Sequence, residues 1–200
     1  MPLPISKCKA GECVRNNSTI LVTGAAGFIG SNLVCAIRQA FPRATILGLD
    51  RLAIRRGYDR WLQVDLCDER DLRSQLRQVR IDAVIHLAAQ SYVPDSLSRH
   101  ADYVRDNVLG TSTLLSALQE MSDIPRVILA SSCEVYGDQV SPADETAETK
   151  PKSPYAATKL SQESLVVASS AGFGTPYSIL RFFNNFGPGQ QDNRLVPRIL

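Results

Sequence analysis

Two side chains suited to proton transfer, Tyr155 and Lys159, lie four positions apart. On a helix this spacing places both on one face. A phenol with a pKa near ~10 cannot act as a base at neutral pH unless its anion is stabilised, and a neighbouring ammonium does that. Alone, the pair is also typical of a solvated helix face. Its place after a predicted strand that ends in Ser131-Ser132-Cys133-Glu134 favours catalysis, because ligands bind at the carboxyl ends of strands in open α/β sheets.

A glycine-rich segment near the N-terminus, residues 23–30, is suited to binding a phosphate. Gly24, Gly27 and Gly30 lie three positions apart, a variant of the dinucleotide-binding fingerprint. Glycines there permit a tight turn and let a pyrophosphate approach the backbone, while the following helix supplies N–H groups and a positive dipole. A glycine turn formed only for packing is the alternative. The residues expected to contact the cofactor are Gly24, Ala26, Gly27, Phe28, Ile29 and Gly30.

An acidic residue, Asp50, ends the next predicted strand, twenty positions after Gly30. Its carboxylate can accept hydrogen bonds from both ribose hydroxyls and would repel a 2′-phosphate, which predicts NAD as the cofactor. Arg51 could instead bind that phosphate, so NADP is the alternative. Asp65 and Leu66, after the third predicted strand, are placed to meet the adenine. A carboxylate at a helix N-terminus is the other interpretation of Asp65.

The rest of the sequence indicates the elements that position these groups. Short apolar strands alternate with helical patterns, as in βαβ units. The predicted strands cover residues 20–22, 44–49, 61–64, 83–87, 126–130 and 177–182. Helices are expected from Phe28, over 68–79, along a stripe of Val104, Val108, Leu115 and Leu118, and over 155–170. We therefore predict an α/β fold: one doubly wound, mostly parallel Rossmann-type sheet with helices on both faces, over residues 19–200. Residues 1–18 are predicted to be a flexible leader, with a short ordered arm as the alternative.

Composition excludes several other classes. Apolar residues make up 44% of the chain and charged residues 21%, and the formal net charge is only +2, which favours neither nucleic acid nor an anionic membrane as partner. No apolar run approaches the ~18 residues of a membrane span. The five cysteines are scattered without zinc-ligand spacing, so we expect no metal site and no disulfide framework. A reducing, cytoplasmic location is the simpler interpretation.

Six motifs occur in order along the chain: Thr23-Gly24-x-x-Gly27-x-x-Gly30, Leu87-Ala88-Ala89, Asn107-Val108-Leu109-Gly110-Thr111, Ser132-x-x-Val135-Tyr136-Gly137, Tyr155-x-x-x-Lys159 and Arg181-Phe182-Phe183-Asn184-Asn185-Phe186-Gly187-Pro188. Together they resemble the extended short-chain dehydrogenase/reductases, specifically the NAD-dependent nucleotide-sugar epimerases and dehydratases. The resemblance runs from Thr19 to Leu200. Each motif alone is modest, and their order carries the assignment.

The resemblance implies a role for each matching residue. Tyr155 takes the proton of the sugar 4-hydroxyl as hydride leaves C4 for the nicotinamide, Lys159 lowers the pKa of that tyrosine and holds the nicotinamide ribose, and Ser132 hydrogen-bonds the same sugar oxygen. Further cofactor-binding positions are implied at Leu87, Ala88, Ala89 and Asn107, the last also stabilising the active-site backbone. Substrate contacts are implied at Ser91, Tyr92 and Asn184, the asparagine at the diphosphate.

Glu134 separates two reactions within this resemblance. In the family's 4,6-dehydratases a glutamate at the matching position removes the C5 proton once C4 is a ketone, whereas simple 4-epimerases usually lack it. The dehydratases that use an acid pair have Asp where this chain has Cys133. A thiol with a pKa near ~8.5 can donate a proton at neutral pH, or it can be inert filling. The Cys-Glu-Val-Tyr-Gly string is also similar to the 5,6-dehydratases of the tunicamycin type, in which hydride returns to C4.

These implications define the expected function, a nucleotide-sugar dehydratase that uses NAD and acts on a nucleotide-diphosphate sugar by C4 oxidation, C5 proton abstraction and loss of the 6-hydroxyl. A 4-epimerase and a truncated, non-catalytic NAD-binding module are the alternatives. The resemblance implies a nucleotide-sugar lobe of roughly another hundred residues after Leu200, so the expectation is either a truncated chain or one without a substrate lobe of its own. It also implies a homodimer through the helices that follow Asn107 and Tyr155, with a purely intramolecular core as the alternative.

Overall fold

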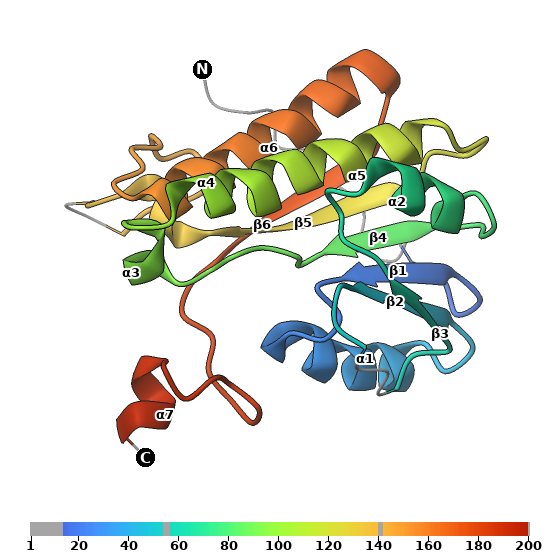
Figure 1. The fold of residues 1–200 in the computed structure, drawn as a ribbon, viewed down its shortest axis with the longest axis horizontal. Helices are drawn as coiled ribbons and strands as arrows, with labels where there is room; N and C mark the ends of the chain where they lie inside the picture. The colour runs from blue at the N-terminus through green and yellow to red at the C-terminus, as the bar shows by residue number, and fades with distance from the viewer. Residues whose placement is uncertain (1–13, 54–56, 140–141, 200) are drawn as a thin grey trace.

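Six parallel strands form the centre of the molecule. The structure is a computed structural model that describes residues 14–53, 57–139 and 142–199. The strand order is β3-β2-β1-β4-β5-β6, and every pair of neighbours runs parallel (Figure 1). The strands are β1 (Thr19–Thr23), β2 (Thr45–Asp50), β3 (Arg60–Gln63), β4 (Ala83–His86), β5 (Arg126–Ser132) and β6 (Tyr177–Phe182). The chain reverses its direction across the sheet between β1 and β4, which creates the crevice where such sheets bind ligands.

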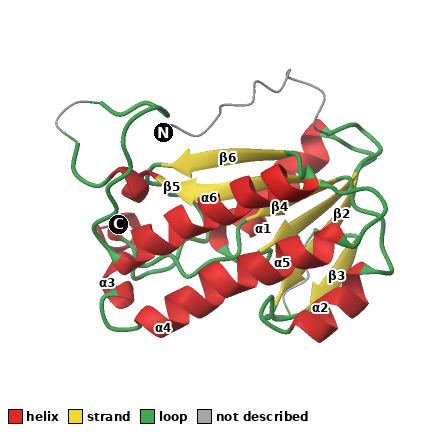
Figure 2. Ribbon diagram, turned by 90° about the horizontal axis from the view of Figure 1, so that it is seen from above, coloured by secondary structure: helices red, strands yellow, loops and turns green. Residues whose placement is uncertain are grey.

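Helices cover both faces of this sheet. Helix α1 (Phe28–Ala40) lies on one face, and α2 (Glu69–Leu76), α5 (Gly110–Gln119) and α6 (Pro154–Phe173) lie on the other (Figures 1 and 2). The shorter elements are α3 (Val93–Ser96), α4 (His100–Tyr103), the π-helical turn η1 (Val104–Leu109), the 3₁₀ turn η2 (Cys133–Tyr136) and α7 (Leu195–Ile199). The predicted doubly wound Rossmann-type fold is confirmed.

Burial on both faces explains why the inner strands β1, β2, β4 and β5 are mostly apolar. One core, between the sheet and α2, α5 and α6, includes Leu21, Leu47, Val84 and Leu114. A second, between the sheet and α1, includes Ile20, Val22, Val34 and Ile46. Successive residues of β1 thus point to opposite cores, as strand geometry requires.

The structure corrects the predicted helical stripe after β4. Val104 is 53% exposed, whereas Leu115 and Leu118 are buried. The cause is η1: a π-helical turn rotates the chain by a different angle per residue, so a stripe extrapolated at the α-helical period points its first member outward. Helix α7 lies in a segment for which no helix was predicted. Of the predicted leader, residues 1–13 lie outside the described part, while Val14 and Ser18 pack against the domain.

A buried ion pair joins α6 to the edge strand β6. Arg181 donates to both carboxylate oxygens of Glu163, at 3.0 Å and 2.8 Å, and the glutamate is fully buried. Ser131 of β5 donates to the same carboxylate at 2.5 Å, and the guanidinium lies 4.8 Å from the ring centroid of Tyr136. Since each polar group of this cluster has a partner, the helix that carries Tyr155 is fixed to β5 and β6.

We predict that replacing Arg181 with methionine lowers the free energy of unfolding by about 3–5 kcal/mol, because a buried carboxylate is left without its counter-charge. Urea denaturation measures this. The matched control, Lys152→Met, breaks an exposed ion pair with Asp138 and should cost less than about 1 kcal/mol. Equal losses in the two variants would contradict the assignment.

Candidate active site

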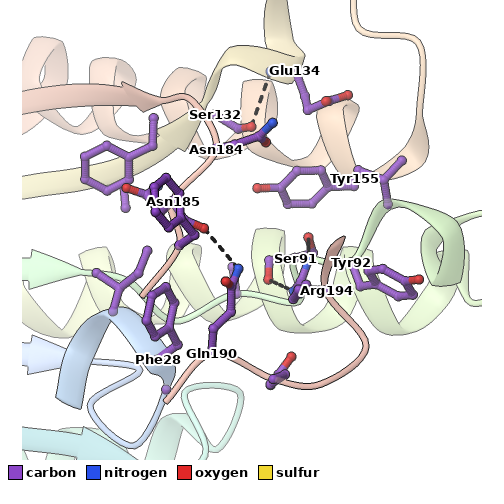
Figure 3. A pocket seen from close by; sticks show the side chains of 18 of the residues that line it. Phe28, Ser91, Tyr92, Ser132, Glu134, Tyr155, Asn184, Asn185, Gln190 and Arg194 are labelled. Atoms are coloured by element: carbon purple, nitrogen blue, oxygen red, sulfur yellow. Dashed lines mark hydrogen bonds between the residues drawn. The ribbon is translucent and has the colours of Figure 1, made fainter. Parts of the chain in front are cut away.

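A cavity of about 920 Å³ opens at the carboxyl ends of β1, β4, β5 and β6 (Figure 3). It brings together residues far apart in the sequence that are predicted to bind the cofactor, to bind the substrate or to transfer protons. Those that line it are Gly24, Gly27, Phe28, Ile29, Gly30, Leu87, Ala89, Ser91, Tyr92, Ser132, Cys133, Glu134, Tyr155, Lys159 and Asn184. Ala26, Asp50, Asp65, Leu66, Ala88 and Asn107 were predicted too, but are not among its lining residues.

The glycine turn is shaped to admit a ligand against the backbone. Gly24 has φ of +67°, and a Cβ there would lie 2.7 Å from the backbone nitrogen of Ala88; a Cβ on Gly30 would lie 2.5 Å from the Gly24 carbonyl oxygen. Both positions therefore require glycine. Among the described residues no side chain caps the start of α1, and its first turn carries no acid. Free N–H groups and the positive end of the helix dipole remain for a pyrophosphate, so the turn fits a dinucleotide.

Two predicted cofactor-binding acids have different surroundings. Asp50 accepts hydrogen bonds from the backbone nitrogens of Ala26, at 3.1 Å, and Leu52, at 3.0 Å, so its carboxylate is fixed beside the glycine turn. Asp65 instead pairs with Arg105 at 2.7 Å and accepts from the backbone nitrogen of Cys67. Burial acts to raise the pKa of Asp65, but these hydrogen bonds outweigh it and the pKa is lowered.

Local sequence explains how Tyr155 is placed. Ser153 caps α6 by accepting from the Ala156 nitrogen at 3.1 Å, and Pro154 occupies the first helical turn, so the helix starts just before the tyrosine. The ring packs edge-on against Tyr103, with centroids 6.4 Å apart. Burial raises the pKa of Tyr155, while the Ser132 hydroxyl acts in the opposite direction. The phenol is therefore protonated at neutral pH unless a further positive charge stabilises its anion.

The ammonium of Lys159 is one turn further along α6 and is 4% exposed. Its Nζ donates to the carbonyl oxygen of Ala130 at 2.7 Å and to Oε1 of Gln162 at 2.9 Å. Burial lowers the pKa of Lys159 to about 7, although the charge of Glu163 acts to raise it. The lysine charge therefore changes near neutral pH.

The turn after β5 holds a second pair of proton-transfer groups. This pair is Cys133 and Glu134, which both line the cavity. Ser132, the last residue of β5, accepts a hydrogen bond from the backbone nitrogen of Glu134 at 3.2 Å, and the 3₁₀ turn starts there (Figure 3). Burial, followed by the charge of Glu134, raises the pKa of the Cys133 thiol. The thiol keeps its proton at neutral pH and can donate it.

Asn107 lies behind the cavity and fixes its backbone. Its Oδ1 accepts from the Gln90 nitrogen at 2.7 Å, and its Nδ2 donates to the Gln90 carbonyl and to the Thr158 hydroxyl at 2.9 Å. These bonds connect the loop after β4 to α6. Contact of Asn107 or Ala88 with a cofactor stays a prediction.

The segment after β6 supplies cavity residues that the sequence did not indicate. Arg194 lies over the ring of Tyr92, 5.0 Å from its centroid, and donates to Ser91 Oγ at 2.8 Å. Gln190 donates to the Asn185 carbonyl at 3.0 Å, and its buried Oε1 has no hydrogen-bond partner among the described residues (Figure 3). That oxygen could accept from a bound ligand. The segment has no regular period, so only its ordered motif pointed to the cavity.

The fold and the cavity define a dinucleotide-binding protein of the Rossmann class. Residues 20–200 match the NAD-dependent epimerase/dehydratase family, and the chain belongs to it. The prediction of NAD as cofactor is confirmed at the level of this family.

Three similar proteins illustrate its range. A dTDP-glucose 4,6-dehydratase of Neisseria meningitidis is 34% identical over 203 residues, covering 90% of this chain and 57% of that protein. A double mutant of DesIV, a dTDP-glucose 4,6-dehydratase from Streptomyces venezuelae crystallised with NAD, is 33% identical with a TM-score of 0.81; the match covers 90% of this chain and 60% of that one. UDP-glucuronic acid 4-epimerase from Bacillus cereus, in complex with UDP-glucuronic acid and NAD, is 32% identical with a TM-score of 0.80, over 90% and 61% of the two chains. The present chain thus spans less than two thirds of the length of these relatives.

Two expected absences concern metals and membranes. Among the described residues there is no group of three or more His, Cys, Asp or Glu side chains arranged to hold a metal ion. Within the same part of the chain, no helix has the length and apolar character needed to cross a bilayer.

His86, the last residue of β4, is buried in the core close to Lys159. Burial, together with the charge of Lys159, lowers its pKa from 6.5 to about 3. Between these values the unfolded chain binds a proton that the folded chain does not, so stability increases with pH.

We therefore expect the contribution of His86 to the unfolding free energy to fall by about 1.4 kcal/mol per pH unit below its ordinary pKa. Urea denaturation at several acidic pH values should give a smaller slope for His86→Gln than for the unaltered chain. The exposed His100 offers the matched control: His100→Gln removes a histidine as well, so comparing the two variants isolates the effect of burial at His86. An unchanged slope in His86→Gln would show that this histidine is protonated in the fold.

Proposed function

We propose that this chain carries the NAD-binding and proton-transfer half of a nucleotide-sugar dehydratase. One observation supports this most: a single cavity is lined by the glycine turn, by the turn with Glu134, and by Tyr155 with Lys159. A pyrophosphate at the start of α1 leaves the other end of the cofactor directed toward those proton-transfer groups. When bound, NAD supplies the acceptor for the C4 hydride.

In this proposal each residue has one task. Tyr155, as its anion, accepts the proton of the sugar 4-hydroxyl; Lys159 in its charged form stabilises that anion and binds the nicotinamide ribose; Ser132 donates a hydrogen bond to the same sugar oxygen. Asn184 contacts the diphosphate, and Ser91 and Tyr92 contact the sugar nucleotide.

The second stage removes water. Glu134 accepts the C5 proton, which a C4 ketone acidifies, and Cys133 donates a proton to the departing 6-hydroxyl, so that one proton is taken and one is given. The hydride taken from C4 then returns to the sugar, so the net reaction is loss of water without consumption of the cofactor. A carboxylate at position 134 supports dehydration over epimerisation, as do the relatives from Neisseria and Streptomyces. Because the similar Bacillus protein is a 4-epimerase, 4-epimerisation is the alternative reaction. Because the chain covers only part of its relatives, a non-catalytic NAD-binding module is the other alternative.

A panel of UDP-, dTDP- and GDP-sugars, analysed by mass spectrometry for loss of water, tests the proposal with the purified protein and NAD. Tyr155→Phe should lower turnover by at least about 10²-fold, because it removes the proton acceptor. Glu134→Gln should lower dehydration by about 10²-fold yet still oxidise C4, detected as transient absorbance of reduced nicotinamide. Glu145→Gln, an exposed carboxylate outside the cavity lining, should behave as the unaltered chain.

The outcomes separate the alternatives. A product of unchanged mass with inverted configuration at C4 identifies an epimerase. When the reaction is run in deuterated water, an epimerase product carries no deuterium at C5 or C6. If the protein binds NAD but forms no product from any sugar nucleotide, the non-catalytic NAD-binding module is supported. Dehydration undiminished in Glu134→Gln would overturn the role of that glutamate.

We also infer a homodimer through η1, α5 and α6 in the reducing cytoplasm. Val104 and Leu109 are about half exposed, at 53% and 50%, and small residues of α6, Ala157, Ser164 and Ala168, are exposed as well.

Leu109→Glu should convert a dimer to a monomer in sedimentation velocity, because it buries a charge at the proposed interface. Ser74→Glu adds the same charge on exposed α2 and should leave the mass unchanged. A monomer before any substitution would refute the dimer.

A further inference from the structure

A closed set of hydrogen bonds behind the cavity leads from the glycine turn to Lys159. Thr23, the residue before Gly24, contacts His86 Nδ1 at 2.7 Å, and His86 Nε2 contacts the Thr111 hydroxyl at 2.9 Å. Gln162 donates from Nε2 to the same hydroxyl at 2.6 Å, and its Oε1 accepts from Lys159. Apart from the lysine, at 4% exposure, these side chains are 0–1% exposed.

Proton counting gives each bond of this set one direction. The Thr111 hydroxyl has a single proton, which it donates to the Asn107 carbonyl at 2.6 Å. It must therefore accept from both His86 and Gln162. The longer contact between Nε2 of Gln162 and Nε2 of His86, at 3.5 Å, then joins two donors and is not a hydrogen bond. His86 then carries its proton on Nε2 and accepts at Nδ1 from Thr23, which is the neutral form.

The same counting fixes the amide of Gln162. If the amide were reversed, its NH₂ group would face the ammonium of Lys159, donor against donor, and its oxygen would face a hydroxyl whose proton is already used. The carbonyl oxygen therefore faces Nζ. An ammonium has three protons, and Ala130 and Gln162 accept two of them, which leaves one for the cavity that Lys159 lines.

We propose that Gln162 is a positioning residue for Lys159: its amide, locked by Thr111 and neutral His86, holds the ammonium with one N–H directed into the cavity. This rests on the proposed function only in that the free N–H is the one offered to the cofactor. Gln162 itself is separated from the cavity, since it is not among the lining residues.

The charge of the lysine is the property that this amide controls. The titratable groups around the ammonium are Tyr155 and Glu163 on α6, His86 on β4, and Cys133 and Glu134 beyond β5. Glu163 is engaged by Arg181 and Ser131, and His86 is neutral. Gln162 is thus a neutral acceptor that supports the charged form against burial, and Lys159 titrates at about 7.

The test is a pH titration of isotope-labelled lysine by NMR in the intact chain, with the Lys159 signal assigned from its loss in Lys159→Arg. Gln162→Met keeps the volume but removes the acceptor, so the lysine pKa should fall by about one unit. Gln162→Glu supplies a charged acceptor, and the pKa should rise by about one unit or more. A general loss of packing would not produce shifts of opposite sign.

Two controls complete the experiment. Gln119→Met alters another helical glutamine, bonded to Ser169, and should leave the Lys159 pKa unchanged. Thr111→Val removes the anchor and should give a smaller fall than Gln162→Met, which keeps the proposal testable if the latter variant does not fold. An unshifted pKa in Gln162→Met, a fall in Gln162→Glu, or a proton on Nδ1 of His86 would overturn the proposal. None of these measurements requires turnover, so they stand or fall independently of the sugar-nucleotide chemistry.

Discussion

The cost of burying one ammonium group shapes the interior of this protein. An unpaired charge in a protein core is destabilising, and the side chain loses its proton unless acceptors replace water. At Lys159 those acceptors are a strand carbonyl and a glutamine amide, with Glu163 one turn further along the helix. Gln162 meets this requirement directly, and Thr111 and His86 support it by holding the amide of Gln162. The sheet face beneath α6 is accordingly polar near the cavity and apolar elsewhere.

Two devices keep that arrangement rigid. The Glu163–Arg181 pair ties α6 to β6, and the bonds from Asn107 tie the same helix to the loop after β4. The helix is thus held on both sides of the lysine. On the opposite wall of the cavity, Gly24 and Gly30 allow the turn to pack against the backbone of the loop after β4 and against the turn itself. A ligand seated between these walls meets groups that do not need to rearrange, which is the condition for electrostatic stabilisation of developing charge.

The parts of the fold that follow from periodicity could be predicted from the sequence, and so could those cavity residues that belong to local motifs. Apolar runs identified the four inner strands because burial on both faces leaves few polar positions in them, and shorter apolar stretches sufficed for the edge strands β3 and β6. The stripe at Val104 was wrong because a π-helical turn has no signature in hydrophobic spacing. Arg194 and Gln190 were missed since the segment after β6 has no repeating pattern, and their places depend on contacts with Ser91 and Asn185. Gln162 was invisible for another reason: in sequence it is one more polar residue of a helix, and only the sheet beneath it shows that this face is buried.

In the turn after β5, the two neighbouring side chains Cys133 and Glu134 have different surroundings. Cys133 is partly buried, and both burial and the adjacent carboxylate favour its protonated form. Glu134, the next residue, is exposed and lines the cavity. The protonated thiol thus lies next to the side chain proposed to accept the C5 proton, so a proton donor and a proton acceptor are neighbours in the chain. Because a thiol is uncharged when protonated, it occupies the buried position at a lower desolvation cost than an ionised acid would. Cysteine at position 133 is therefore compatible with an acid–base pair, provided that it acts only as the proton donor.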